Sequence, residues 1–195
     1  MIAKAFQQFN YTSLIVSTIL LLGVSYYYTT IDIKWYFVES KILNGILVFG
    51  SLMLSNYAID TVTRQLTIER SNRNAYHLLL YPLVIFSFPL ESLDMRFILG
   101  SAAIWSAWRN TRLFIETTNN QEKIKRLLDA VLLITISSFL ILENIFILIV
   151  PIIILFLGNI KRDIKYFIII IGTPIIIIPT ISVILSFLNL DNKLF

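Results

Sequence analysis

The sequence has no cysteine and only one histidine, His77. Disulfides, thiolate nucleophiles and cysteine-ligated metals are therefore excluded, and a cluster of metal-ligating histidines cannot form within one chain. Charged residues are scarce as well, at 14% of the 195 residues, where a soluble domain carries about 25%. Gly-rich phosphate loops and nucleophile elbows are also missing. The sequence thus offers none of these common catalytic motifs.

Isoleucine, leucine and phenylalanine are abundant instead. Hydrophobic residues make up 57% of the chain, and the mean hydropathy is +0.79. A soluble fold of this length could not cover so much apolar side chain, because its surface must remain largely polar. A lipid bilayer can cover it. The composition therefore predicts an all-α integral membrane protein, with residues 1–195 forming a single transmembrane helical domain.

Seven apolar segments alternate with polar stretches along the chain. They lie at 12–28, 42–59, 77–90, 95–108, 127–141, 145–157 and 166–188. The first has no signal-peptide cleavage pattern and is expected to remain as a span. Only the first, second and seventh approach the roughly 20 residues of a perpendicular span. The middle four have about 13 to 15 residues, or roughly 20 Å of helix, and are predicted to form two short hairpins in the bundle.

Basic and acidic residues alternate from one polar stretch to the next. If the N-terminus is cytoplasmic, most of the 16 lysines and arginines fall on the cytoplasmic side, while several acids collect outside. The net charge of +4 is then a consequence of membrane topology. Nucleic-acid binding is not expected, because no basic run is interleaved with stacking aromatic residues. The sequence predicts seven membrane crossings, with the N-terminus inside and the C-terminus outside.

Five bases fall in one polar segment, residues 109–126. They are Arg109, Arg112, Lys123, Lys125 and Arg126. One interpretation is that this segment lies on the anionic leaflet, where each base contributes about 1 kcal/mol, or docks a partner subunit. The alternative is an ordinary cytoplasmic loop that follows the positive-inside rule. His77, at the cytoplasmic start of the third span, is expected to be an interfacial residue rather than a proton relay.

Four acids belong to the predicted outer loops: Asp32, Glu91, Asp94 and Glu143. If the hairpins are short, their turns at 89–94 and 143–144 lie below the headgroups. A carboxylate there costs several kcal/mol unless it is paired, hydrated or protonated, so these acids are candidates for function. The alternative is that they cap helices at wet turns. Asp94 and Asn144 each have the sequence position of an N-cap.

The stretch 77–156 resembles an uncharacterised family of multi-pass inner-membrane proteins from Bacteroidota. The resemblance lies in a short hairpin with an acidic outer turn, the sequence Ala-Trp-Arg-Asn-Thr-Arg-Leu at 107–113, a charged helix start at 125–130, and a second short hairpin. It implies a multi-pass inner-membrane protein and carries no activity.

A first span, an acid just after it and a hairpin with an acidic outer turn also resemble the seven-span module of GT-C-type glycosyltransferases. That resemblance implies sugar transfer from polyprenyl-phosphate carriers at the outer face. Asp32 would match the first-loop catalytic acid, and Glu91 with Asp94 would match the acidic pair of the second outer loop. The chain departs from the pattern in two places. Its first outer loop is short, and Glu-Ser-Leu-Asp at 91–94 replaces Asp-x-Asp or Asp-x-Glu.

Three functional hypotheses follow. The first is an accessory, non-catalytic subunit of a membrane complex in cell-envelope assembly, because catalytic motifs are missing while small residues and prolines suit contacts with partner helices. The second is a minimal GT-C-like transferase or polymerase acting on polyprenyl-linked sugars. The third is a small transporter with Glu143 as its ion or proton site. The expected partners are the bilayer and other subunits, and no cofactor is expected unless GT-C-like chemistry adds a divalent metal.

Overall fold

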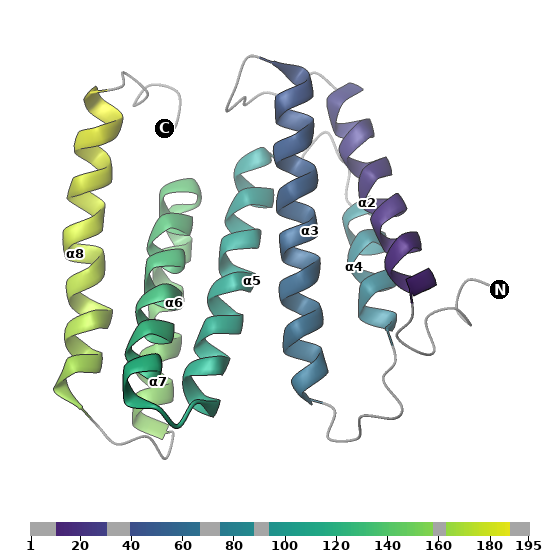
Figure 1. Cartoon of the computed structure of the whole chain (residues 1–195). Helices are drawn as coiled ribbons and strands as arrows, with labels where there is room; N and C mark the ends of the chain where they lie inside the picture. Colours follow the sequence, from purple (N-terminus) through teal and green to yellow (C-terminus); the bar gives the residue numbers. More distant parts are fainter. Residues whose placement is uncertain (1–10, 31–39, 67–74, 88–93, 158–162, 188–195) are drawn as a thin grey trace. The chain divides into compact units, whose positions relative to one another are not determined.

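A computed structural model describes residues 11–30, 40–66, 75–87, 94–157 and 163–187. The regular structure of these residues is helical, as the composition predicts, and consists of seven α-helices and one 3-10 helix (Figure 1). The elements are α2 (Tyr11–Thr30), α3 (Lys41–Leu66), α4 (Tyr76–Ser87), α5 (Met95–Glu116), α6 (Asn120–Leu140), η2 (Leu142–Leu148), α7 (Ile149–Leu157) and α8 (Ile164–Phe187). The all-α prediction is confirmed for this part of the chain.

Three of the described helices are long and apolar enough to cross a membrane. They are Tyr11–Thr30, Lys41–Thr63 and Ile164–Ile184. They correspond to the first, second and seventh apolar segments, which are the three that the sequence places near span length. The structure therefore fits a membrane protein.

The polar segment 109–126 is mostly helical. α5 continues past the apolar residues to Glu116, and α6 already begins at Asn120, so both helices are longer than the hydropathy pattern predicts. The hydropathy falls after Trp108 and rises again at Leu127, while helical structure continues to Glu116 and resumes at Asn120. Arg112 pairs with Glu116 one turn away at 2.9 Å, and the Asn119 side chain accepts a hydrogen bond from the Gln121 backbone as an N-cap.

The chain divides into two compact units, Met1–Ala102 (unit 1) and Ala103–Phe195 (unit 2). In unit 1, α2, α3 and α4 all contact one another. Ser25 bonds Gly45 and Asn56 bonds Ser17, so the numbering falls along α3 as it rises along α2. These two helices are therefore antiparallel. α4 runs antiparallel to α3 as well, because its first turn lies beside the end of α3, where His77 meets Asp60.

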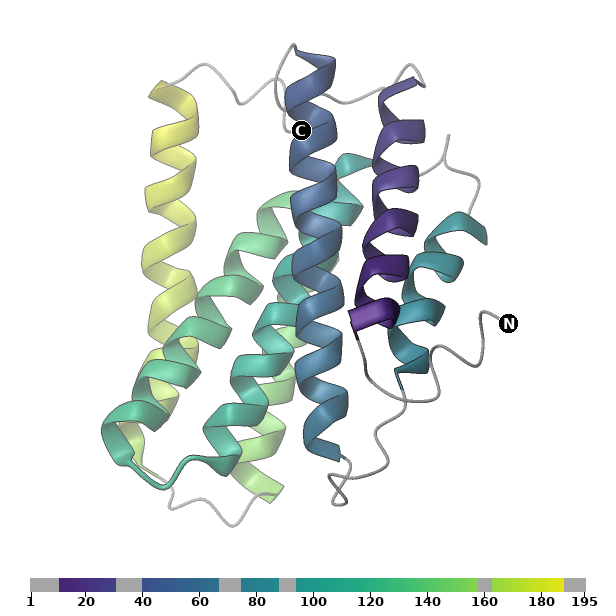
Figure 2. The same ribbon diagram turned by 45° about the vertical axis from the view of Figure 1, so that its right-hand side comes forward.

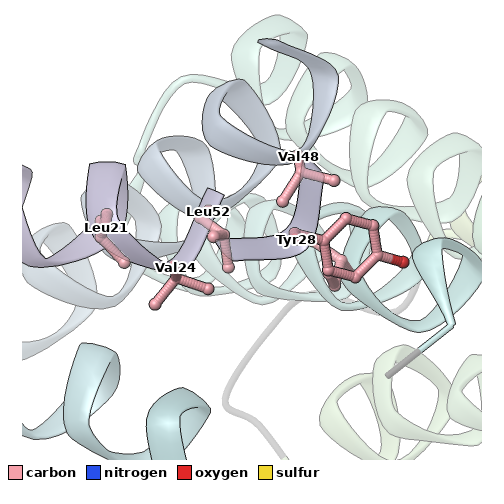
Figure 3. Packing of buried hydrophobic residues seen from close by; sticks show 6 residues of the cluster. Leu21, Val24, Tyr28, Val48 and Leu52 are labelled. Atoms are coloured by element: carbon pink, nitrogen blue, oxygen red, sulfur yellow. The ribbon is translucent and has the colours of Figure 1, made fainter. Parts of the chain in front are cut away.

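An apolar core lies at one end of unit 1. Leu21, Val24 and Tyr28 of α2 pack against Val48 and Leu52 of α3, and Ile98 at the start of α5 joins them. Figure 3 shows the four aliphatic side chains gathered on the facing sides of the two helices, with the Tyr28 hydroxyl pointing away from them. All six side chains are at most 3% exposed. This core holds the ends of α2 and α3 together.

Unit 2 has a second apolar core, built by four helices. Its members are Phe114, Leu127, Val131, Leu155, Tyr166 and Ile170. Phe114 and Tyr166 meet edge to face with ring centroids 5.4 Å apart. The core therefore joins the end of α5, the start of α6, the end of α7 and the start of α8. These four helix ends lie together at the lower edge of Figure 1, and Figure 2 shows α8 running beside α6 in unit 2.

The second predicted hairpin has an unexpected form. α6 ends at Leu140, Ile141 is extended, and a 3-10 helix then folds back against α6 before α7 continues. At about 2.0 Å per residue in the 3-10 part and about 1.5 Å in the α part, Leu142–Leu157 is roughly 28 Å long. The 3-10 geometry thus extends a segment that residue count alone makes too short. Pro151 lies in the first turn of α7, where a missing backbone N–H is tolerated.

Candidate functional site

Unit 1 contains a group of buried polar side chains between its helices. We call Ser17, Asn56, Asp60 and His77 the polar cluster. Asn56 and Asp60 are one turn apart on α3, so both lie on one face of that helix. Both are buried, at 5% and 3% exposure, inside the candidate span Lys41–Thr63. The cluster therefore places an ionisable side chain within a segment that is apolar enough to cross a membrane.

Asn56 connects α3 to α2. Its Nδ2 donates to Ser17 Oγ at 2.8 Å, and Ser17 is 1% exposed. The Asn56 Oδ1 atom is buried and makes no hydrogen bond to the described residues. An unsatisfied buried carbonyl costs about 1–3 kcal/mol, so this atom is a place for a water molecule or another donor. The Asn56 side chain therefore joins two helices through its Nδ2, while its Oδ1 makes no hydrogen bond to the described residues.

Asp60 connects α3 to α4. Its Oδ1 lies 2.9 Å from His77 Nε2, and the two side chains are 4% and 16% exposed. A carboxylate in an apolar span is costly unless a partner compensates for its lost hydration, and the imidazole is such a partner. The His77 ring N–H can donate to the Asp60 carboxylate, so the contact satisfies a buried carboxylate between two helices.

The hydropathy pattern does not reveal this pair. Asp60 stands at the edge of an apolar segment and groups with the polar stretch after it, while His77 is expected to be interfacial. A detectable signal exists, because Ser13 and Ser17 on one helix, and Asn56 and Asp60 on the next, repeat the four-residue spacing of a single helix face. Two such polar faces in neighbouring apolar helices indicate that they face each other.

A second close contact between α2 and α3 is made by small residues. The Ser25 hydroxyl donates to the Gly45 carbonyl at 2.6 Å, and Gly45 presses against Thr29 so closely that a Cβ atom there would meet Thr29 Cγ2. Small residues allow helix backbones to approach in this way in membrane proteins. The contact fixes the separation of the two helices near the end of α2.

Asp94, a candidate catalytic acid by resemblance, caps α5. Its Oδ1 accepts from the Arg96 backbone N–H at 3.0 Å, and its Oδ2 binds the Arg96 guanidinium at 2.6 Å. The N-cap interpretation is therefore confirmed for Asp94. Asp32 and Glu91, its proposed companions, lie outside the described residues.

Glu143 is exposed and is the second residue of η2. The position of Asn144 predicted a helix N-cap, but the structure shows none there. Its Nδ2 donates to Ser137 Oγ at 2.6 Å, and η2 begins two residues earlier without a side-chain cap. That prediction was wrong because Ile141 is extended and turns the chain before Asn144, which leaves the amide facing α6.

The five bases of the segment 109–126 lie on the helix ends that meet at the core of unit 2. Arg112 pairs with Glu116, and Arg126 pairs with Glu122 at 3.2 Å and reaches Asn110 Oδ1 at 3.5 Å. Lys123 and Lys125 are on the first turns of α6, and Arg109 is on the last turns of α5. The bases are therefore gathered at one end of unit 2, whereas Glu143 follows the opposite end of α6.

The described residues contain no group of three or more histidines, aspartates or glutamates placed to hold a metal ion. Comparison of the chain with protein-family models, curated proteins and solved structures gave no match. The geometry of these residues is therefore the basis on which a function can be proposed.

Proposed function

We propose that the chain is a multi-pass protein of the cell inner membrane that acts as an accessory, non-catalytic subunit of a membrane complex in cell-envelope assembly. The observation that carries this proposal is the exposure of α8. Within Ile164–Ile184 the mean hydropathy is 2.6, yet only 11% of the residues in its most apolar window are buried. Such a helix must be covered by lipid or by another helix.

The second half of α8 favours a partner helix as the cover. Pro179 has no N–H and so releases the Ile175 carbonyl from its helical hydrogen bond. Thr180 and Ser182, which follow it, are exposed and bond back to carbonyls of their own helix. In a bilayer, the freed Ile175 carbonyl is better satisfied against a neighbouring helix than against acyl chains. Ile175, Pro179 and Ser182 are spaced four and three residues apart, so they share one face of this isoleucine-rich helix, and that face suits docking of another membrane subunit.

The arrangement of the bases supports the proposed orientation. Arg109, Lys125 and Lys165 belong to helix ends that meet at one end of unit 2. The alternation of helix direction within each unit is what repeated membrane crossings require. A cytoplasmic N-terminus would then place this basic end in the cytoplasm.

The test is site-specific photo-crosslinking in intact membranes, with the crosslinker placed at position 175 or 182. We expect an adduct with a second protein at both positions. Ile184, which is exposed on the opposite side of α8, is the matched control and should give lipid adducts or none. Ser182→Leu should also lose any chain that co-purifies in mild detergent. A protein that purifies as a monomer and gives no protein adduct at 175 or 182 would contradict the proposal.

The polar cluster favours a second candidate, a small transporter with an intramembrane carboxylate. Among the described residues, Asp60 is the acid that is buried, whereas Glu143 is exposed, so the candidate site moves from Glu143 to Asp60. The measurement is proton uptake by proteoliposomes under a membrane potential. Asp60→Asn should abolish uptake and Glu143→Gln should leave it unchanged. If wild-type protein gives no uptake above empty liposomes with a range of co-ions, the transporter hypothesis is wrong.

A further inference from the structure

An open groove runs between α2 and α3 in unit 1, away from the polar cluster. Its volume is about 440 Å³. The lining residues are Leu22, Ser25, Tyr26 and Thr29 of α2 with Lys41, Ile42, Gly45, Ile46 and Phe49 of α3. The groove forms because the helices touch through the small residues Ser25 and Gly45, while larger side chains stand on either side of that contact.

The polarity of the groove changes along its length. Lys41 is the first residue of the candidate span Lys41–Thr63, and Thr29 is the second-last residue of α2, so this end of the groove lies at the edge of both spans. Leu22 and Phe49 lie about two helical turns further along, or roughly 10 Å deeper. One end therefore belongs at the membrane interface and the other in the hydrocarbon region.

The walls of the groove suit an acyl chain. A single acyl chain is thin enough to lie along the apolar walls of Leu22, Ile46 and Phe49. The groove is also within the roughly 300–1,000 Å³ range of small-molecule sites.

A positive charge at the mouth of the groove favours a ligand with an anionic headgroup. Lys41 is exposed at the mouth of the groove and brings a positive charge to the interface. Tyr26 stands beside it as an exposed aromatic residue, the type that marks the headgroup level. Basic residues between membrane helices bind the phosphates of lipid headgroups. The geometry points to a phospholipid site: one acyl chain lies along the groove, and the lipid phosphate binds Lys41.

The site can be tested by native mass spectrometry of the purified full-length protein. The probes are palmitoyl-oleoyl phosphatidylglycerol and palmitoyl-oleoyl glycerol, which has the same chains without the phosphate. We expect the wild type to retain one phosphatidylglycerol molecule. Lys41→Gln should weaken its binding about fivefold and leave palmitoyl-oleoyl glycerol binding unchanged, while Lys41→Arg should keep the preference for the phosphate.

The second part of the test fills the groove with a larger side chain. Ile46→Trp should weaken binding of both lipids about tenfold, the equivalent of roughly two fewer buried methylenes. Ile19→Trp is the matched control, because Ile19 on α2 is as exposed as Ile46, at 60% against 59%, but does not line the groove. Equal lipid retention in the two tryptophan variants would overturn the proposal. So would a Lys41→Gln protein that still prefers phosphatidylglycerol over palmitoyl-oleoyl glycerol as wild type does. If Ile46→Trp does not fold, the Lys41 comparison decides alone.

Discussion

The two units bury polar groups in different ways. In unit 1, buried side chains bond from one helix to another: Asn56 to Ser17, Ser25 to Gly45 and Asp60 to His77. In unit 2, the buried hydroxyls of Thr111, Thr135 and Ser138 bond to carbonyls of their own helices, and Ser137 alone among the buried hydroxyls with a bond described above accepts from another element, the adjoining η2. A hydroxyl bonded to its own helix is satisfied before any tertiary contact forms. A cross-helix bond is satisfied only in one packing arrangement, so it fixes register.

The candidate spans of the two units also differ in burial and in hydropathy. In the most apolar window of Lys41–Thr63, 44% of the residues are buried at a mean hydropathy of 1.6, against 11% and 2.6 for Ile164–Ile184. α3 is the less apolar helix because it faces polar partners, and α8 is isoleucine-rich because most of its surface has no partner within the chain. Hydropathy thus reports what surrounds a helix as well as whether it can cross a membrane. Four sets of substitutions test this contrast.

The largest effect is expected from removing the buried carboxylate of unit 1. Asp60→Ala leaves His77 without its partner between two helices, and breaking a buried pair costs about 3–5 kcal/mol. Unfolding of detergent-solubilised protein, followed by circular dichroism, should show this loss. Glu143→Ala removes an exposed carboxylate from unit 2 and should change stability by less than about 0.5 kcal/mol. Equal effects of the two substitutions would mean that Asp60 is not part of a compensated buried pair.

A core substitution should produce the next largest effect, in unit 2. Leu127 on α6 is 0% exposed and packs in the core with Phe114 and Tyr166. Leu127→Ala should destabilise the protein by about 2–5 kcal/mol through lost burial and the cavity that remains. Leu128→Ala, at the neighbouring position that is 37% exposed, is the control and should cost much less. If Leu128→Ala is equally damaging, the assignment of the buried face of α6 is wrong.

The close helix contact of unit 1 gives the third test. Gly45→Ala places a Cβ atom against Thr29 Cγ2 and should destabilise the α2–α3 pair by about 1–3 kcal/mol. A Cβ atom on Gly50 of the same helix would meet no neighbouring side chain or helix within 4 Å, so Gly50→Ala should be neutral or stabilise by up to about 1 kcal/mol through helix propensity. Thermal unfolding in detergent measures both changes. Thr29→Ser, which removes Cγ2, should restore much of the stability of Gly45→Ala; failure of this rescue would rule out the steric explanation.

Hydropathy identified the all-α class and the three longest candidate spans, because those depend on composition within one segment. It did not reveal how far α5 and α6 extend beyond their apolar parts, because Arg112, Glu116 and Asn119 continue or cap helices without being apolar. Local sequence position assigned Asn144 to a cap, although an extended Ile141 turns the amide toward Ser137 instead. The Asp60–His77 pair was missed for a different reason: it joins two helices, and the periodicity of either helix alone does not say which residue of the other it faces.

The smallest effects should come from two asparagine–serine bonds that differ mainly in what they join. Asn56 reaches Ser17 across 39 residues at 2.8 Å, and Asn144 reaches Ser137 across seven residues at 2.6 Å. Side-chain hydrogen bonds in membrane proteins contribute about 0.6 kcal/mol on average and at most about 1.7. Asn56→Ala should fall near the upper value, because Ser17 is then left buried between two helices. Asn144→Ala should fall near the average, because Asn144 and Ser137 are only seven residues apart and their bond closes a local turn. Double-mutant cycles with Ser17→Ala and Ser137→Ala measure the two coupling energies. A larger coupling for the Asn144 pair would show that distance, rather than connection between separate helices, sets the strength of these bonds.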